Sequence, residues 1–157
     1  MFNTDLNTPR SELELRIEKL QVKLDENNIN GVLILQKADL FYFSGTIQDA
    51  HLYVPCDNEP ILMVYKDLER ASAESSIKNI VPLKNIEQIC SLLHDNGYSM
   101  PQILGMELDI LPANLYFNYK SLFEHTKLID ISHYIRLIRA VKSTYEIDMI
   151  QIGRAHV

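Results

Sequence analysis

Apolar residues near the start of the chain recur at helical spacing. Four of them follow one another at intervals of four, three and four positions: Leu13, Ile17, Leu20 and Leu24. This stripe predicts an amphipathic helix that packs one side on a core. Ser11 and Glu14 have the spacing of a capping box, so we expect the helix to begin there. We assign its charged residues to the solvent face: Glu12, Arg16, Glu18, Lys19 and Lys23.

The following segments have the pattern of strands. The helix should end in the Asn- and Gly-containing stretch 27–31, where the chain can adopt a positive φ. Residues 32–35 are apolar without alternation, as in a strand that is covered on both faces. Residues 50–55 and 60–65 flank a polar loop that contains a proline, which predicts a hairpin. Shorter strands are predicted at 79–83, 102–106 and 127–130.

Helical segments separate these strands. They are predicted at 66–76, 86–93, 112–123 and 131–139. Asp39 is placed to cap a short turn through 40–43, which Gly45 closes. Ser143 and Glu146 form a second capping box, which opens a further helix. The alternation of the two kinds of segment predicts one α/β domain of three layers, with a central mixed sheet flanked by helices.

Composition and charge narrow the possible partners. The chain has 157 residues, of which 46% are hydrophobic and 23% charged, as in a single globular domain. Fifteen basic against 21 acidic residues give a net charge of −6, and no cluster of five or more Lys or Arg occurs. Such a surface repels phosphate, so we expect no nucleic-acid partner. No apolar run approaches the roughly 20 residues of a membrane helix, so we expect no membrane partner either.

The sequence also lacks the pattern of a secretory signal. The first residues contain neither the basic nor the apolar region of a secretory signal. Cys56 and Cys90 form no C-x-x-C pair, so both are expected to be reduced thiols. These two observations predict a cytoplasmic protein.

Candidate chemistry is scarce. The five histidines form no H-x-x-x-H or H-E-x-x-H pattern, and phosphate-binding glycine loops and nucleophile elbows are missing. Asp130 and His133 are the nearest approach to a cluster, which we interpret as a helix cap beside a surface histidine. Cys90 lies on the apolar side of a predicted helix, and Cys56 lies in a loop with no base nearby in sequence.

Two carboxylates follow the strand at 102–106. Glu107 and Asp109 are two positions apart, and a role in acid–base catalysis would need burial to raise the pKa of one of them. Nothing in the sequence indicates such burial, so we interpret the pair as part of a solvated loop. The aromatic run 41–43 is interpreted as core in preference to a ligand platform.

Three segments together resemble a known family. The first is the leading helix that ends in Asn30-Gly31-Val32-Leu33-Ile34. Residues 38–45 read Ala-Asp-Leu-Phe-Tyr-Phe-Ser-Gly, and 135–147 read Ile-Arg-Leu-Ile-Arg-Ala-Val-Lys-Ser-Thr-Tyr-Glu-Ile. They resemble the motifs N-x-x-Y-[LF]-[ST]-G and L-R-x-[IV]-K-[ST]-x-x-E-[IL] of the N-terminal domain of the creatinase/prolidase/aminopeptidase P family. The second motif is matched by Arg139, Lys142, Ser143, Glu146 and Ile147, whereas Asp39 replaces the usual Asn of the first. The resemblance covers roughly residues 11–152.

The resemblance implies that this domain and a catalytic domain have different roles. In this family a pita-bread catalytic domain follows, in which two Asp, one His and two Glu hold two divalent metals, Mn, Co or Zn. That centre activates water to cleave X–Pro bonds. This chain is then a non-catalytic N-terminal domain without a cofactor of its own. Its expected partners are its own catalytic domain, a second copy in a homodimer, and proline-containing peptides.

The resemblance also assigns regions and residues. We expect a flexible arm at 1–10, the domain at 11–140, and the start of a linker helix at 141–157, with a candidate non-native tail at 153–157. Four residues would border the substrate entrance: Thr46, Gln48, Asp49 and His51. Four others would form the interdomain linker: Arg139, Lys142, Ser143 and Glu146. We expect the linker residues to lack their partners in this chain.

Two other interpretations stay open. The chain could be a self-standing α/β domain that binds a small molecule or a protein, without enzymatic activity. It could also be a small enzyme that uses Asp130, His133 or Cys56.

Overall fold

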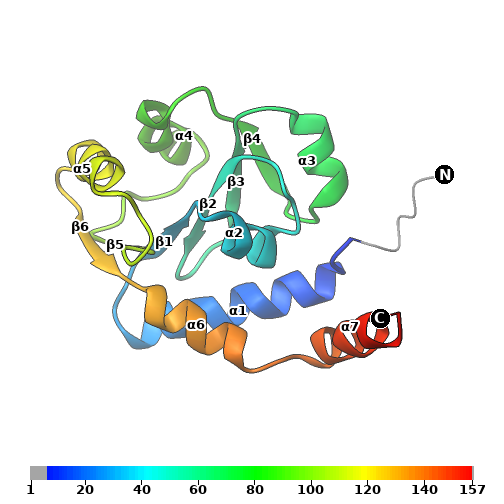
Figure 1. Ribbon diagram of the computed structural model, residues 1–157. Helices are drawn as coiled ribbons and strands as arrows, with labels where there is room; N and C mark the ends of the chain where they lie inside the picture. The colour runs from blue at the N-terminus through cyan, green and yellow to red at the C-terminus, as the bar shows by residue number, and fades with distance from the viewer. Residues whose placement is uncertain (1–6, 157) are drawn as a thin grey trace.

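The computed structural model describes residues 7–156, in which a central sheet carries helices on both faces (Figure 1). The sheet has six strands in the order β4-β3-β2-β1-β5-β6. These strands are β1 (Gly31–Ile34), β2 (Ala50–Pro55), β3 (Ile61–Val64), β4 (Asn79–Pro82), β5 (Ile103–Met106) and β6 (Lys127–Asp130). β2 pairs antiparallel with both of its neighbours, and the other pairings are parallel. The mixed sheet is confirmed, and β6 has the bounds expected from the sequence.

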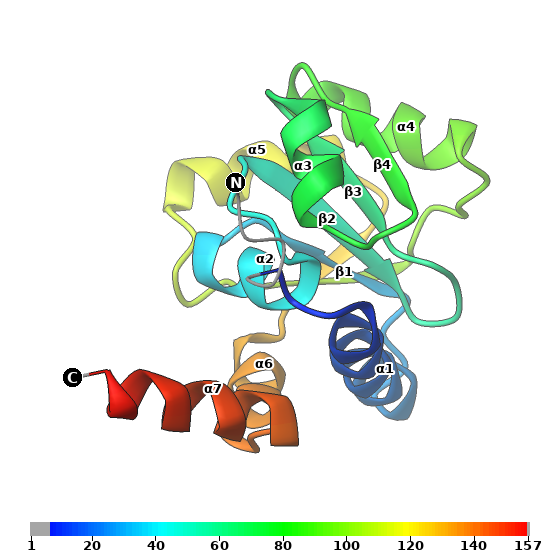
Figure 2. The ribbon, with the colours of Figure 1, turned by 90° about the vertical axis from the view of Figure 1, so that its right-hand side faces the viewer.

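The helices are divided between the two faces. They are α1 (Arg10–Glu26), α2 (Lys37–Ser44), α3 (Leu68–Glu74), α4 (Ile89–Asp95) with a preceding 3-10 turn, α5 (Ala113–Leu122), α6 (Ser132–Ala140) and α7 (Thr144–Ala155). One core cluster joins α1, α2 and α6 to one face of the sheet, and a second joins α4 and α5 to the other. This arrangement confirms the predicted three-layer α/β domain, and α7 projects away from it (Figure 2).

The central strand explains why the apolar run at 32–35 lacks alternation. Val32 and Ile34 pack in the core cluster under α1, whereas Leu33 packs in the cluster under α5. All four residues of β1 are buried because helices cover both faces of the sheet. A close approach also occurs at β5, where a Cβ on Gly105 would lie 2.6 Å from the Ile131 side chain. A side chain larger than hydrogen therefore does not fit at residue 105 unless Ile131 moves.

The beginning of α1 differs from the prediction. The helix begins at Arg10 after Pro9, and no side chain caps it, so the expected Ser11–Glu14 capping box is wrong. Pro9 accepts the first backbone hydrogen bonds through its carbonyl, which places Ser11 inside the first turn. Glu12 and Arg16 are buried rather than exposed, at 7% and 6% exposure, because the start of α7 and α2 cover this side of α1.

Two further caps can be compared with expectation. Gln36, not Asp39, caps α2, since its side-chain oxygen accepts from the Asp39 N–H at 2.8 Å. The second capping box is confirmed, because Ser143 and Glu146 exchange both expected hydrogen bonds. α7 then continues to Ala155, past the point where the apolar stripe was expected to break.

The predicted arm at 1–10 falls mostly on residues outside the described range. None of the helices in residues 7–156 combines the length and apolar character that a membrane crossing requires.

Candidate functional site

Two of the expected entrance residues converge on Glu74. Thr46 donates its hydroxyl hydrogen to Glu74 Oε2 at 2.6 Å, and Gln48 donates from Nε2 to Oε1 at 3.4 Å. The backbone N–H of Ile47 donates to the same carboxylate at 3.2 Å. Burial opposes the charge, but these hydrogen bonds and nearby Arg70 lower the pKa of Glu74 below its ordinary value. The loop after α2 is therefore held in place by one carboxylate.

The other two entrance residues lie apart from that carboxylate. Asp49 is exposed and pairs at 3.5 Å with the equally exposed Lys37. His51 points to the opposite face of the sheet, where its Nε2 lies 2.5 Å from the Tyr119 hydroxyl and its ring meets the edge of Tyr65. Burial lowers the pKa of His51 to about 4, so the imidazole is neutral at physiological pH. The structure thus groups Thr46 with Gln48, and separates Asp49 and His51 from them.

The expected linker residues have partners within this chain, contrary to our prediction. Arg139 Nη1 lies 2.5 Å from Asp39 Oδ1, and the guanidinium lies 5.2 Å from the centre of the Tyr42 ring. Lys142 donates to the Arg139 carbonyl. Asp39, the residue that departs from the family motif, therefore supplies the negative charge that holds α6 against α2.

The first turn of α7 is anchored by buried ionic groups of α1. Ser143 donates its hydroxyl hydrogen to Glu12 Oε1 at 2.6 Å, and Arg16 Nη2 lies 3.3 Å from Glu146 Oε1. Arg16 also contacts Glu12 at 3.1 Å and donates to the Tyr42 carbonyl at 2.8 Å. We call these five residues the α7 anchor. The sequence did not indicate Glu12 and Arg16, because their spacing alone suits an exposed helix pair equally well.

A crevice opens at the carboxyl ends of β1, β5 and β6. Its volume is about 500 Å³, within the range of small-molecule sites. Its polar wall includes Gln36, Asp39, Glu107, Asp109, Arg136 and Arg139. Ligands of open α/β sheets bind outside the carboxyl ends of the strands, at the point where successive connections leave to opposite sides. β1 leads on to β2 on one side and its neighbour β5 leads on to β6 on the other, so this carboxyl-end crevice lies at such a point.

Glu107 is the unusual group of this crevice. It is 7% exposed, and no donor of another described residue reaches its carboxyl oxygens, so its hydrogen-bond partner is Asp39, which accepts the proton of the neutral Glu107 carboxyl. Burial, the charge of Asp39, the hydrogen bond to Asp39 and the charge of Asp109 raise the pKa of Glu107 to about 9, although Arg139 opposes the shift. The interpretation of Glu107 as part of a solvated loop is therefore wrong. β5 ends at Met106, and Glu107 follows it directly, with its buried side chain in the wall of the crevice.

Two further carboxylates, Asp109 in the crevice and Asp130 at the end of β6, are well bonded. Asp109 accepts from Ser132 Oγ at 2.6 Å and pairs with Arg136. Asp130 accepts from the Ser132 and Leu108 backbone N–H groups, at 3.0 and 3.1 Å. Burial opposes the charge, but these bonds lower the pKa of Asp130 below its ordinary value.

The sequence pair of Asp130 and His133 does not form a cluster. Asp130 accepts from the backbone N–H of Ser132, the first residue of α6, and His133 is exposed. Within residues 7–156, no three His, Cys, Asp or Glu side chains gather closely enough to hold a metal ion.

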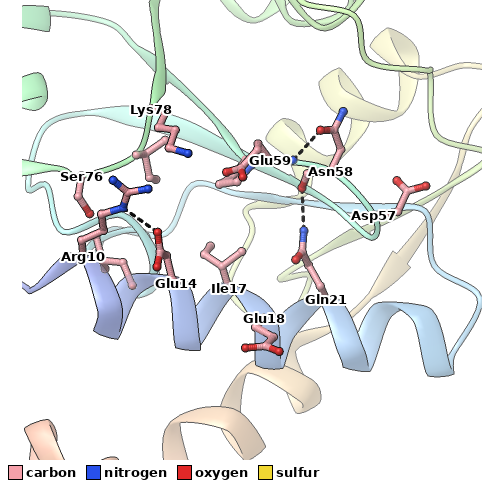
Figure 3. A pocket seen from close by; sticks show the side chains of 13 residues that line it. Arg10, Glu14, Ile17, Glu18, Gln21, Asp57, Asn58, Glu59, Ser76 and Lys78 are labelled. Atoms are coloured by element: carbon pink, nitrogen blue, oxygen red, sulfur yellow. Dashed lines mark hydrogen bonds and ion pairs between the residues drawn. The ribbon is translucent and has the colours of Figure 1, made fainter.

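A second hollow lies between α1 and the loops before β3 and β4 (Figure 3). Its volume is about 410 Å³. Arg10 and Glu14 pair with each other at 2.7 Å, and Gln21 donates to the carbonyls of Pro55 and Asn58, both at 2.8 Å. None of the buried side-chain atoms found without a partner in the described part of the chain lines this hollow. Its polar groups therefore serve to join α1 to the hairpin.

Comparison with known proteins agrees with the fold. A family model described as the creatinase/prolidase N-terminal domain matches residues 16–141. A curated Xaa-Pro dipeptidase from Pyrococcus furiosus is 28% identical over 137 residues, which are 87% of this chain and 38% of that protein. The solved prolidase from the same organism superposes with a TM-score of 0.70 at 29% identity, covering 84% of this chain and 40% of the other.

Other solved structures share the fold at lower identity. A Bacillus anthracis Xaa-Pro dipeptidase has a TM-score of 0.74 at 21% identity, covering 87% of this chain and 38% of the other. A Streptococcus pneumoniae proline dipeptidase structure has a TM-score of 0.69 at 21% identity, covering 80% of this chain and 98% of the other. Since the family model spans most of the domain, from α1 to the end of α6, the chain belongs to the creatinase/prolidase N-terminal domain family.

Proposed function

We propose that this chain is the non-catalytic N-terminal domain of a longer Xaa-Pro dipeptidase, which hydrolyses X–Pro peptide bonds. The observation that carries the proposal is the 28% identity to the Pyrococcus furiosus Xaa-Pro dipeptidase, of which this chain spans 38%. The parent is placed in the cytoplasm, a setting with which the free thiols of Cys56 and Cys90 are compatible.

Catalysis in the parent is assigned to two divalent metals, Mn, Co or Zn. The described residues do not fit such a centre, because no group of His, Cys, Asp and Glu side chains converges. The metals would therefore belong to polypeptide outside this chain, and no catalytic step is assigned to residues of this domain.

The role of this domain is assembly and the bordering of the substrate entrance. The loop with Thr46 and Gln48 is suited to a wall because Glu74 holds it rigidly. Asp49 is the exposed carboxylate of that loop, and it would meet a peptide amino group. His51 would act indirectly, because its contact with Tyr119 holds β2 against α5. A homodimer would bring this wall to the partner's active site.

The test compares two proteins. The 157-residue chain and the full reading frame that contains it are purified and assayed with X–Pro dipeptides in the presence of Mn²⁺, Co²⁺ or Zn²⁺. We expect the full protein to cleave them and the chain alone to leave them intact. Cleavage by the chain alone, or a reading frame that ends near residue 157, would contradict the proposal. An inactive full protein would contradict it as well.

A further inference from the structure

A short segment after β5 lies over a small apolar pocket. The segment is residues 107–112, between the end of β5 and the start of α5, and we call it the strap. The pocket has a volume of about 100 Å³, and we call it the side pocket. Glu107, Ile110, Leu111 and Pro112 of the strap form part of its wall. The rest of the wall is mostly aliphatic and includes Met106, which is fully buried.

On one side, the strap is tied to β6 and α6. Leu108 donates its backbone N–H to Asp130 Oδ1 at 3.1 Å, and Asp109 accepts from Ser132 Oγ at 2.6 Å. Asp109 also pairs with Arg136. The pKa of Asp130 is lowered by its hydrogen bonds, so its carboxylate stays ionised as the pH rises. This side of the strap therefore stays attached in neutral and alkaline solution.

On the other side, Glu107 joins the strap to α2. Its neutral carboxyl donates its proton to Asp39, which lies in the first turn of α2. Asp39 also accepts from Arg139 Nη1 at 2.5 Å, so its carboxylate lies between two donors. Among the described residues, no other side-chain hydrogen bond or ion pair connects the strap with α2. One proton therefore decides whether the strap and α2 attract or repel each other.

The charged groups around Glu107 come from three elements. They are Asp39 on α2, Asp109 in the strap, and Arg136 and Arg139 on α6. While Glu107 is neutral, two carboxylates face two guanidinium groups, and these charges cancel. Loss of the proton adds a third carboxylate at a place where both Glu107 oxygens are shielded from water. Because a buried charge without a counter-charge is strongly unfavourable, the ionised side chain should move into water.

We propose that the strap is a pH-sensitive lid of the side pocket, which is hinged at β6 and α6 and held to α2 by the proton that Glu107 shares with Asp39. When Glu107 ionises, its proton passes to the solvent, and the side chain turns out through the carboxyl-end crevice. The α2 side of the strap then lifts from the aliphatic wall, as a local opening of the fold. Uptake of a proton by Glu107 closes it again. This device does not depend on the proposed peptidase function.

Two methionines supply the readout of the test. Met106 and Met63 are both fully buried in the same core cluster, but only Met106 lines the side pocket. Their isotope-labelled methyl groups are followed by NMR in the presence of a soluble nitroxide, which broadens the signals of accessible methyl groups. Since the pKa of Glu107 is about 9, its ionised fraction rises from about 1% at pH 7 to about 90% at pH 10. Nitroxide broadening of Met106 should therefore grow at least about tenfold, because the open population follows this fraction, whereas Met63 should stay protected.

Three variants separate this device from other effects of alkaline pH. Glu107→Gln cannot ionise but keeps a donor for Asp39, so Met106 should stay protected at pH 10. Asp39→Asn allows Glu107 to ionise but replaces the repelling carboxylate with an amide that can donate to it, so the strap should stay closed here too. Glu124→Gln removes an exposed carboxylate and should open like the wild type.

Four results would overturn the proposal. The first is a folded wild-type protein in which Met106 stays protected at pH 10. The second and third are opening of Glu107→Gln or of Asp39→Asn at the same pH as the wild type. The fourth is broadening of Met63 together with Met106, since that would indicate general unfolding in place of a hinged strap.

Discussion

His51 is a buried imidazole with one nitrogen beside the Tyr119 hydroxyl. Its other nitrogen, Nδ1, has no hydrogen-bond partner among the described residues, and the residue is 4% exposed. A second proton on this ring would place a charge between β2 and α5. Because the pKa of the ring is low in the folded protein, the stability of the fold depends on pH.

The first prediction concerns this imidazole. Burial lowers the pKa of His51 from 6.5 to about 4, so the unfolded chain binds a proton more readily than the folded one. The part of the unfolding free energy that depends on this neutral imidazole is fully present above pH 6.5. It is lost as the pH falls, and the loss reaches about 3 kcal/mol below pH 4. His51→Gln should therefore show a smaller loss of unfolding free energy between pH 7 and pH 4.5 in urea titrations. His94→Gln, at an exposed site, should follow the wild type, and identical slopes for all three proteins would contradict the assignment.

The second prediction concerns Glu107, whose pKa is raised, whereas that of His51 is lowered. Its pKa is raised to about 9 by burial and neighbouring carboxylates, so the folded state holds a proton that the unfolded state releases near pH 4.5. Stability from this group is present below pH 4.5 and decreases as the pH rises toward 9. Glu107→Gln mimics the protonated form, and at pH 8 it should exceed the wild type by at least about 1 kcal/mol.

The measurement for Glu107 is urea unfolding at pH 5 and pH 8. The difference between Glu107→Gln and the wild type should grow with pH, whereas Glu124→Gln should show no such growth. A stabilisation that is equal at both pH values would mean that Glu107 is ionised in the folded protein.

At the scale of elements, α7 is held by its first turn only. Arg16 lies between Glu12 and Glu146 and is 6% exposed, whereas no residue of α7 is buried. Removing one member of a buried ionic group leaves the others uncompensated, which costs far more than the loss of an exposed pair. The α7 anchor therefore sets the direction in which the chain leaves the domain.

The third prediction tests the α7 anchor. Arg16→Met should destabilise the protein by about 3 kcal/mol, because Glu12 is left buried without a counter-charge. It should also release α7, seen as lower heteronuclear NOE values for residues 144–155. Arg10→Met breaks an exposed pair on the same helix and should cost only about 0.5 kcal/mol. Unchanged NOE values in a folded Arg16→Met would show that α7 does not depend on the anchor.

The fourth prediction concerns the contact between β5 and the start of α6. Gly105→Ala introduces a Cβ 2.6 Å from Ile131, so it should destabilise the protein by about 1–3 kcal/mol. Gly153→Ala is the matched control, since nothing lies within 4 Å of its added carbon in α7. That variant should raise helicity by circular dichroism without lowering the midpoint of thermal unfolding. Equal midpoints for both variants would contradict the close packing at Gly105.

At the scale of the whole molecule, the domain presents uncovered apolar side chains at the end of the chain. They are the exposed residues Ile147, Met149, Ile150 and Ile152 of α7. α7 extends away from the sheet and its two helical layers (Figure 2). Most of this helix should therefore contribute little to the stability of the domain.

The fifth prediction follows from that arrangement. A chain that ends after residue 147 keeps the contacts of Ser143 and Glu146 with α1, so its unfolding free energy should match that of the 157-residue chain within about 0.5 kcal/mol. A chain that ends after residue 142 loses both contacts and leaves Arg16 with one counter-charge fewer. It should be less stable in urea titrations. Equal loss from both truncations would mean that the distal part of α7 packs on the domain.

Much of the fold could be predicted from local patterns. The strand at 127–130, the capping box at Ser143 and the fully buried β1 are confirmed as expected. These features depend on residues within one turn or one strand of each other, where periodicity shows which side is apolar. The family resemblance depends on three such local segments, and the match to residues 16–141 confirms it.

What the tertiary structure alone decided is the state of the buried polar groups. Asp39 meets Arg139 one hundred positions later, and Ser143 meets Glu12 across 131 positions. No spacing rule connects such residues, so the sequence showed Glu12, Arg16 and Glu107 only as ordinary charged side chains. Whether a carboxyl is solvated, paired or protonated depends on which elements cover it, and that is settled when the sheet and its helices come together.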